Sequence, residues 1–205
     1  MNESAIRTEE QIISLFPDRE TQVRLGWVLK KMKGQLLVFP LYYRFSEGDI
    51  QENIRRCEEI SRQCGAECVF RIVEHTNYHL RSILTDKGYG LKECGVVSEW
   101  NLTGNAGELC VEGKIQGGLF LRNENNGTGY FMAGKTIIGI KHQWLLFLPD
   151  GNLPNMDLEK ILRFSATNEI IRILADIPGK EELPEQYVRA GFQRAYLYRC
   201  YQKED

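Results

Sequence analysis

The sequence carries one short pattern twice, about 100 residues apart. Residues 70–73 read FRIV and residues 171–174 read IRIL, and each run precedes a helix-like segment that ends in glycine and an aromatic residue. These endings are Gly88-Tyr89 and Gly191-Phe192, which lie 17 residues (71 to 88) and 19 residues (172 to 191) after the runs. A repeat of this length is too long for a solenoid unit. It indicates two α/β modules of similar design.

Both halves are expected to follow the same order of elements. The first half is expected to hold a hairpin, a helix, a strand, a helix and a strand at 25–45, 50–64, 68–73, 78–87 and 96–102. In the second half the same order is expected at 130–142, 157–165, 170–175, 183–190 and 194–201. Such alternation predicts an α/β (α+β) fold with a mixed sheet and helices on its faces.

The best linker candidate is the small, polar segment TGNAGE at residues 103–108. It predicts an N-terminal domain at 1–103 and a C-terminal domain at 104–205. The sequence also predicts the start of one helix and the turn of one hairpin. Thr8 and Gln11 form a capping box for a helix at 8–16, and Gly134-Lys135 forms the turn of the hairpin at 130–142.

Composition excludes several classes of protein. The 205 residues include 26 Lys+Arg and 28 Asp+Glu, a formal charge of −2, and the basic footprint of a nucleic-acid binder is missing. No apolar run reaches the ~18 residues of a membrane span, and the polar N-terminus does not resemble a signal peptide. Six cysteines without an export signal are expected to be reduced thiols. We therefore expect a cytoplasmic protein without nucleic-acid or membrane partners.

The one metal-like constellation is Cys64, Cys68, His75 and His79. Zinc fingers of this kind place about twelve residues in the central loop, whereas only six separate Cys68 from His75. A strand over 69–73 would also hold the two pairs apart. Buried thiols and surface histidines are therefore expected, with no metal. No P-loop, G-x-G-x-x-G or G-x-S-x-G motif is present.

A family resemblance lies in the segments that end each half. AGFQRAYLYRCYQK, which follows LPEQY, resembles the end of the GNAT superfamily of acyl-CoA-dependent acetyltransferases. Tyr187 stands four residues before Gly191, which is the spacing of the tyrosine that often serves as the family's general acid. Residues 26–102 resemble the reduced first half of tandem GNAT proteins.

The resemblance implies acyl transfer from acetyl-CoA, as cosubstrate, to an amine of a small molecule or protein. Tyr187 would be the catalytic residue, because a neutral phenol can protonate the departing thiolate. The partners implied are acetyl-CoA, an unidentified amine acceptor and, as an option, a second copy of the chain in a homodimer. The cofactor-binding residues implied are Phe147, Leu148, Gly151, Asn152 and Leu153.

The sequence also departs from the family's pattern. GNAT enzymes hold the CoA pyrophosphate on a [QR]-x-x-G-x-[GA] loop, where backbone N–H groups face the anion. Residues 150–157 read DGNLPNMD, with one glycine and a proline that removes a donor, so the loop is degenerate. Two hypotheses therefore stand: an N-acetyltransferase, or a catalytically inactive binding module for a ligand or protein with the same fold. In the second, Tyr187 only packs its helix on the sheet.

Overall fold

The structure is a computed structural model that describes residues 3–15, 21–24, 26–32, 34–41, 50–74, 76, 78–101, 120–122, 130–138, 141–148, 151, 155–167 and 170–204. The chain divides into two compact units. Unit 1 comprises residues 1–8, 17–94 and 197–205, and unit 2 comprises residues 9–16 and 95–196. Because residues 103 and 104 lie outside the described part, a boundary between domains 1–103 and 104–205 stays a prediction.

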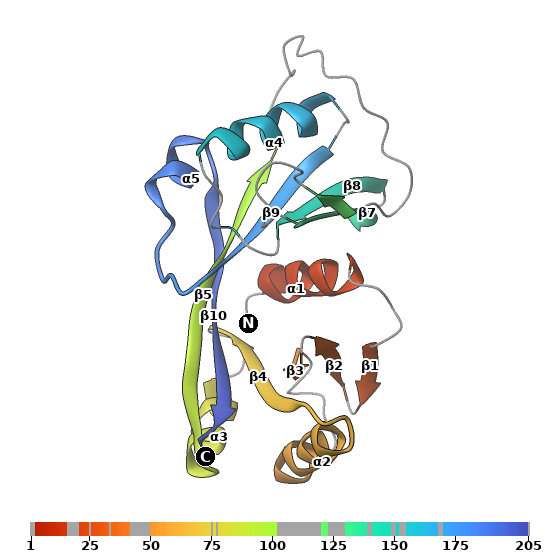
Figure 1. Cartoon of the computed structure of the whole chain (residues 1–205), viewed down its shortest axis with the longest axis vertical. Coiled ribbons are helices and arrows are strands. Elements are labelled where there is room, and N and C mark those ends of the chain that lie inside the picture. The colour runs from red at the N-terminus through yellow and green to blue at the C-terminus, as the bar shows by residue number, and fades with distance from the viewer. Residues whose placement is uncertain are drawn as a thin grey trace. The chain divides into compact units, whose positions relative to one another are not determined.

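Unit 1 is built on strands in the order β1-β2-β3-β4-β10-β5 (Figure 1). Strands β1 to β3 are antiparallel, β3 and β4 are parallel, and β4 is antiparallel to β10. The last two strands, β10 and β5, each run on into unit 2. The bounds are β1 Thr21–Arg24, β2 Trp27–Met32, β3 Gln35–Phe39, β4 Glu67–Val73, β10 Gln193–Lys203 and β5 Tyr89–Asn101.

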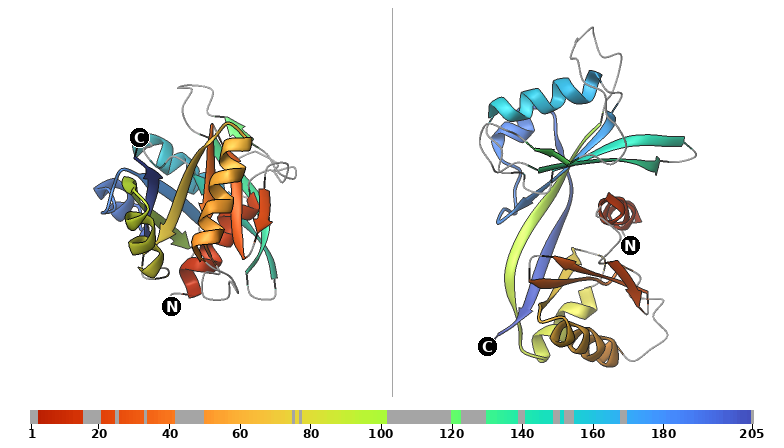
Figure 2. Two further views of the ribbon diagram at one scale, coloured as in Figure 1. Left: turned by 90° about the horizontal axis from the view of Figure 1, so that it is seen from below. Right: turned by 45° about the vertical axis from the view of Figure 1, so that its right-hand side comes forward.

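The parallel pair β3 and β4 needs a crossover, and helix α2 (Ile50–Gln63) lies within it, as the apolar spacing predicts. Figure 2 shows α2 lying against one face of the strands of unit 1. A second helix, α3 (Tyr78–Asp86), follows β4. The core beneath these helices contains Ile54, Phe70 and Leu80, none of which is exposed.

Unit 2 repeats this local arrangement with other strands. Its order is β10-β5-β9-β8-β7-β6, in which β8 and β9 are the parallel pair. Helix α4 lies between β8 and β9 in sequence and contacts β9, and helix α5 follows β9 (Figure 1). The bounds are β6 Phe120–Arg122, β7 Tyr130–Ile138, β8 Lys141–Leu148, α4 Asn155–Thr167, β9 Ile170–Pro178 and α5 Glu185–Arg189.

The prediction of a capping box at Thr8 is wrong. Helix α1 spans Glu3–Leu15, so Thr8 lies inside it and its Oγ1 donates a hydrogen bond to the Ser4 carbonyl at 2.9 Å. A threonine in a helix bonds the carbonyl four residues earlier instead of capping an end. The capping pattern therefore lies inside the helix and not at its first turn.

The prediction of a turn at Gly134-Lys135 is also wrong. Strand β7 continues through both residues, with Gly134 opposite Leu145 and Lys135 opposite Trp144 on β8. Pairing with a neighbouring strand keeps the glycine extended, whereas the Gly-Lys dipeptide by itself suggests a turn.

The predicted mixed α/β fold with helices on the sheet is confirmed. In each half the second helix is followed by a glycine with positive φ, +79° at Gly88 and +86° at Gly191, a conformation that favours glycine. Each of these glycines lies just before a long strand, β5 or β10. A duplication of the two halves stays a prediction.

The core of unit 1 predicts how stability depends on pH. Burial, with a smaller effect of Glu58, raises the pKa of the Cys57 thiol from 9.0 to about 12. The folded state therefore keeps a proton that the unfolded state loses above pH 9, so the free energy of unfolding should fall as the pH rises from 9 to 12. In urea titrations across this range, Cys57→Ala should lessen the fall by up to about 1.4 kcal/mol per pH unit. An equal slope in the variant would contradict the assignment.

Candidate functional site

The site begins with Tyr187 on the short helix α5. The Tyr187 side chain is fully buried, and its ring meets Phe192 edge to face with centroids 5.1 Å apart. The Phe192 amide donates to the Tyr187 carbonyl at 2.9 Å, and Gly191 makes the turn between them. The Gly-aromatic ending thus fixes the ring of Tyr187 as part of one small cluster.

The Tyr187 hydroxyl points to the peptide that follows β8. It donates a hydrogen bond to the Gly151 carbonyl at 2.5 Å, inside the protein. The Gly151 amide in turn donates to the Asp176 carbonyl on β9 at 2.6 Å. The ladder of β8 and β9 ends with Leu148 opposite Ala175, so Gly151 extends the contact between the two chain segments beyond it.

Close approach explains why glycine stands at position 151. A Cβ there would lie 2.5 Å from Cγ1 of Ile177, 2.8 Å from the Asp176 carbonyl oxygen and 3.2 Å from the Tyr187 hydroxyl. Two of these neighbours cannot move without shifting the backbone or the core. The space around Gly151 is therefore filled by the protein itself.

The structure brings together only some of the sequence-predicted site residues. Gly151 and Tyr187 are in contact. Phe147 and Leu148 are each 1% exposed on β8, opposite Leu174 and Ala175 of β9. Alternation along the strand directs their side chains to opposite faces of the sheet. Asn152 and Leu153 lie outside the described residues.

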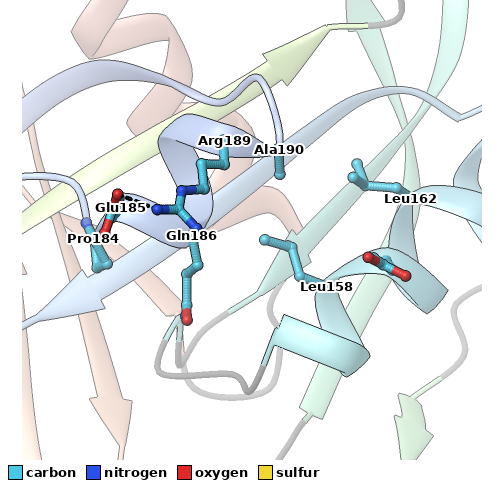
Figure 3. A pocket seen from close by; sticks show the side chains of 8 residues that line it. Leu158, Leu162, Pro184, Glu185, Gln186, Arg189 and Ala190 are labelled. Carbon is cyan, nitrogen blue, oxygen red and sulfur yellow. Dashed lines mark hydrogen bonds and ion pairs between the residues drawn. The ribbon is translucent and has the colours of Figure 1, made fainter.

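A pocket of about 520 Å³ lies beside this site, between α4 and α5. Figure 3 shows Leu158 and Leu162 of α4 facing Gln186, Arg189 and Ala190 at α5. The mouth is polar, with an exposed ion pair between Arg189 and Glu185 at 2.5 Å, and such exposed pairs add little to stability. The pocket has the size and mixed lining that small-molecule sites usually have.

No pattern in the sequence predicts this pocket. Leu158 and Leu162 have the spacing of a helix face buried against the sheet, and Leu158 is indeed 2% exposed. Leu162, in contrast, is only half-buried, which indicates that this part of α4 is not fully packed against the sheet. Glu185 and Arg189 have the i,i+4 spacing of a helical ion pair, so they could have indicated that α5 is a helix. They could not have indicated that a pocket separates α5 from α4.

The described residues hold no group of three or more His, Cys, Asp or Glu side chains placed as metal ligands. Of the metal-like constellation, His75 lies outside the described part, and the Cys68 thiol has its pKa raised by burial. Within the same described part, no helix is long and apolar enough to cross a membrane.

The architecture was compared with known proteins. A GCN5-related N-acetyltransferase from Sphaerobacter thermophilus matches with a TM-score of 0.56 and 11% identity, over 87% of this chain and 76% of that one. A second, from Kribbella flavida, matches with a TM-score of 0.53 and 11% identity, over 98% of this chain and 96% of that one. The chain has a GNAT fold.

At this identity the likeness establishes the GNAT fold alone, and the activity must be argued from the site. No protein-family model and no curated protein sequence matches the chain.

The crowding at Gly151 can be tested by substitution. Gly151→Ala should destabilise the protein by about 1–3 kcal/mol, because the new Cβ overlaps Ile177 and the backbone of Asp176. Gly90→Ala is the matched control, since the three atoms nearest to its Cβ would all belong to the Glu204 side chain, which is exposed and can swing away. Urea unfolding should give a change within about 0.5 kcal/mol for the control. Equal losses in both variants would show that crowding at Gly151 is not decisive.

Proposed function

We propose that the protein is an acyltransferase that moves an acetyl group from acetyl-CoA to an amine. The observation that carries the proposal is the position of Tyr187, which reaches from α5 to the chain just after β8, near the point where the pairing of β8 with β9 ends. The resemblance to GNAT enzymes implies that Tyr187 would lie beside the thioester sulfur and that the pyrophosphate would lie near residues 151–153. The GNAT fold supports the same reading.

Acetyl-CoA supplies an acyl group activated as a thioester. In the proposed reaction a carbon–nitrogen bond to the amine forms as the carbon–sulfur bond breaks, and Tyr187 donates its phenolic proton to the departing thiolate. The amine nitrogen loses one proton to solvent, and a proton from solvent restores the phenol of Tyr187. Phe147 and Leu148 would border the pantetheine arm, and the pocket between α4 and α5 offers volume for a further part of the cosubstrate. Tyr187 must release the Gly151 carbonyl before its proton can move to sulfur.

The fit to the pyrophosphate is incomplete. The Gly151 amide already donates to Asp176, so it is not available to an anion in this arrangement. The first N–H groups of a helix have no partner within the helix, so those at the start of α4, which begins at Asn155, are the donors that would face the pyrophosphate. The cytoplasmic location, the absence of nucleic-acid and membrane partners, and the homodimer option stay proposals of the same kind.

A non-catalytic binding module is the second candidate. It is favoured by the same two hydrogen bonds, because Tyr187 and Gly151 each already have an internal partner and the space between them is filled. A protein that uses the GNAT fold only to hold a ligand or a partner protein needs no accessible phenol.

A measurement of acetyl-CoA binding distinguishes an acetyl-CoA-dependent enzyme from a module that binds another ligand or a protein. At an acetyl-CoA concentration of 100 Kd, ligand binding should stabilise the folded state by about 2.7 kcal/mol and raise Tm by roughly 5–10 °C. Ala190→Phe, which fills the α4–α5 pocket, should reduce the rise, whereas Val188→Phe introduces the same side chain at an exposed position outside it. No rise with millimolar acetyl-CoA or CoA would discard the acyltransferase and leave the binding module.

The role of Tyr187 is tested by turnover. Tyr187→Phe should lower kcat by about 10²–10⁴-fold with little change in KM, because it removes the proton donor and keeps the ring. Tyr201→Phe is the matched control, since it removes a buried hydroxyl from unit 1 without touching Tyr187. CoA release would be followed with a panel of amines. Turnover of Tyr187→Phe equal to that of the unaltered protein would remove the catalytic assignment.

A further inference from the structure

The lining of the pocket between α4 and α5 carries more negative than positive charge. Two carboxylates, Glu159 and Glu185, and one guanidinium, Arg189, belong to it, which leaves a net charge of −1. Arg189 is already paired with Glu185 at 2.5 Å. The carboxylate of Glu159, which is exposed on α4, makes no ion pair or hydrogen bond with any described residue. A ligand in this pocket therefore meets one uncompensated carboxylate, and the only cation of the described lining is already paired.

The other residues of the lining are neutral. Leu158 is 2% exposed and Leu162 is half-buried on α4, and Pro184 and Ala190 come from the segment that holds α5 (Figure 3). Gln186 adds an amide group, which can both donate and accept hydrogen bonds. Such a lining suits an uncharged ring or chain with a few hydrogen-bonding groups, and it offers little to an additional negative charge.

Glu159 also lies near the expected position of the pyrophosphate. The proposed donors to that group are the first N–H groups of α4, which begins at Asn155, and Glu159 follows on the same helix (155 to 159). At ~1.5 Å per residue, this spacing is about 6 Å along the helix axis. The Debye length is ~8 Å at physiological ionic strength, so salt screens charges at this separation only in part. Phosphate groups held at the start of α4 therefore interact with this carboxylate.

Few backbone donors are present to offset the repulsion. The Gly151 amide already donates to the Asp176 carbonyl, and Pro154 has no N–H group. The pyrophosphate keeps the donors at the start of α4. CoA carries a further phosphate on the 3′ oxygen of its ribose, and a phosphate monoester adds a charge of about −1.5 to −2 at pH 7. The described lining of the pocket holds no unpaired cation to meet that charge.

We propose that the acyl donor of this site is a pantetheine thioester whose nucleotide end carries little negative charge, so that acetyl-dephospho-CoA is a better donor than acetyl-CoA. The inference rests on the proposed acyl transfer and names the class of donor for it. The bonds that form and break are those of the proposed reaction, and dephospho-CoA leaves as the thiol. Affinity would come from the pantetheine arm and the uncharged base, while the 3′-phosphate weakens binding.

The test compares CoA with dephospho-CoA, which differ only in the 3′-phosphate, by isothermal titration calorimetry. At an ionic strength of about 0.01 M, dephospho-CoA should bind about three- to ten-fold more tightly, because repulsion between the 3′-phosphate and Glu159 is then weakly screened. At about 1 M, where the Debye length is ~3 Å, the two Kd values should agree within about two-fold. The kcat/KM values of the two acetyl thioesters with one amine should follow the same order.

Three exposed carboxylates make the test specific, and none of them belongs to the core. Glu159→Gln removes the uncompensated charge, so the ratio of the CoA Kd to the dephospho-CoA Kd should fall about two- to five-fold. Glu185→Gln releases Arg189, so CoA should then bind as tightly as dephospho-CoA or more tightly. Glu204→Gln is the matched control, since it removes the same charge from unit 1 and should leave the ratio within about two-fold.

The outcomes separate this inference from the acyl-transfer proposal. If CoA binds at least as tightly as dephospho-CoA at low ionic strength, the inference fails and acyl transfer stands. A preference for dephospho-CoA that is unchanged at about 1 M salt, or unchanged in Glu159→Gln, would also overturn it, because repulsion from the pocket would not be the cause. If neither molecule binds at millimolar concentration, the acyl-transfer proposal fails, and the inference fails with it.

Discussion

The peptide at Gly151 makes hydrogen bonds through both its amide and its carbonyl. These two bonds set the positions of the described segments of unit 2 around it. Its amide is bonded to β9 through Asp176, and its carbonyl receives the Tyr187 hydroxyl from α5. A single small residue just after β8 thus joins this part of the chain to β9 and to the helix that follows β9. Because no side chain fits at this point, the three segments can approach closely. The pocket between α4 and α5 lies outside this closed centre.

Predictions from the sequence were correct where a single hydrophobic period dominates a segment. Helix α2 begins at Ile50, as its apolar spacing predicts, because Ile54 and Cys57 must both face the core. Predictions failed where a local signal competes with tertiary pairing. Thr8 carries the capping pattern but lies within α1, and Gly134 resembles a turn but is held extended by β8. Neighbouring strands and helices decide such positions, and a single sequence does not contain them.

The candidate site was partly predictable for a similar reason. The spacing of Tyr187 from Gly191 placed the phenol on a short helix before a strand, and that placement is observed. Gly151, within Pro-Asp-Gly-Asn, carried only a loop signal, so its role in closing the space beside β9 could not be foreseen.

A ligand that uses Tyr187 or Gly151 would have to displace hydrogen bonds within the protein. Near the pocket between α4 and α5, the Tyr187 hydroxyl and the Gly151 amide already have protein partners, so use of either group requires an internal hydrogen bond to open first. The apparent affinity of a ligand that needs those groups is reduced by the fraction of molecules in which the bonds are open.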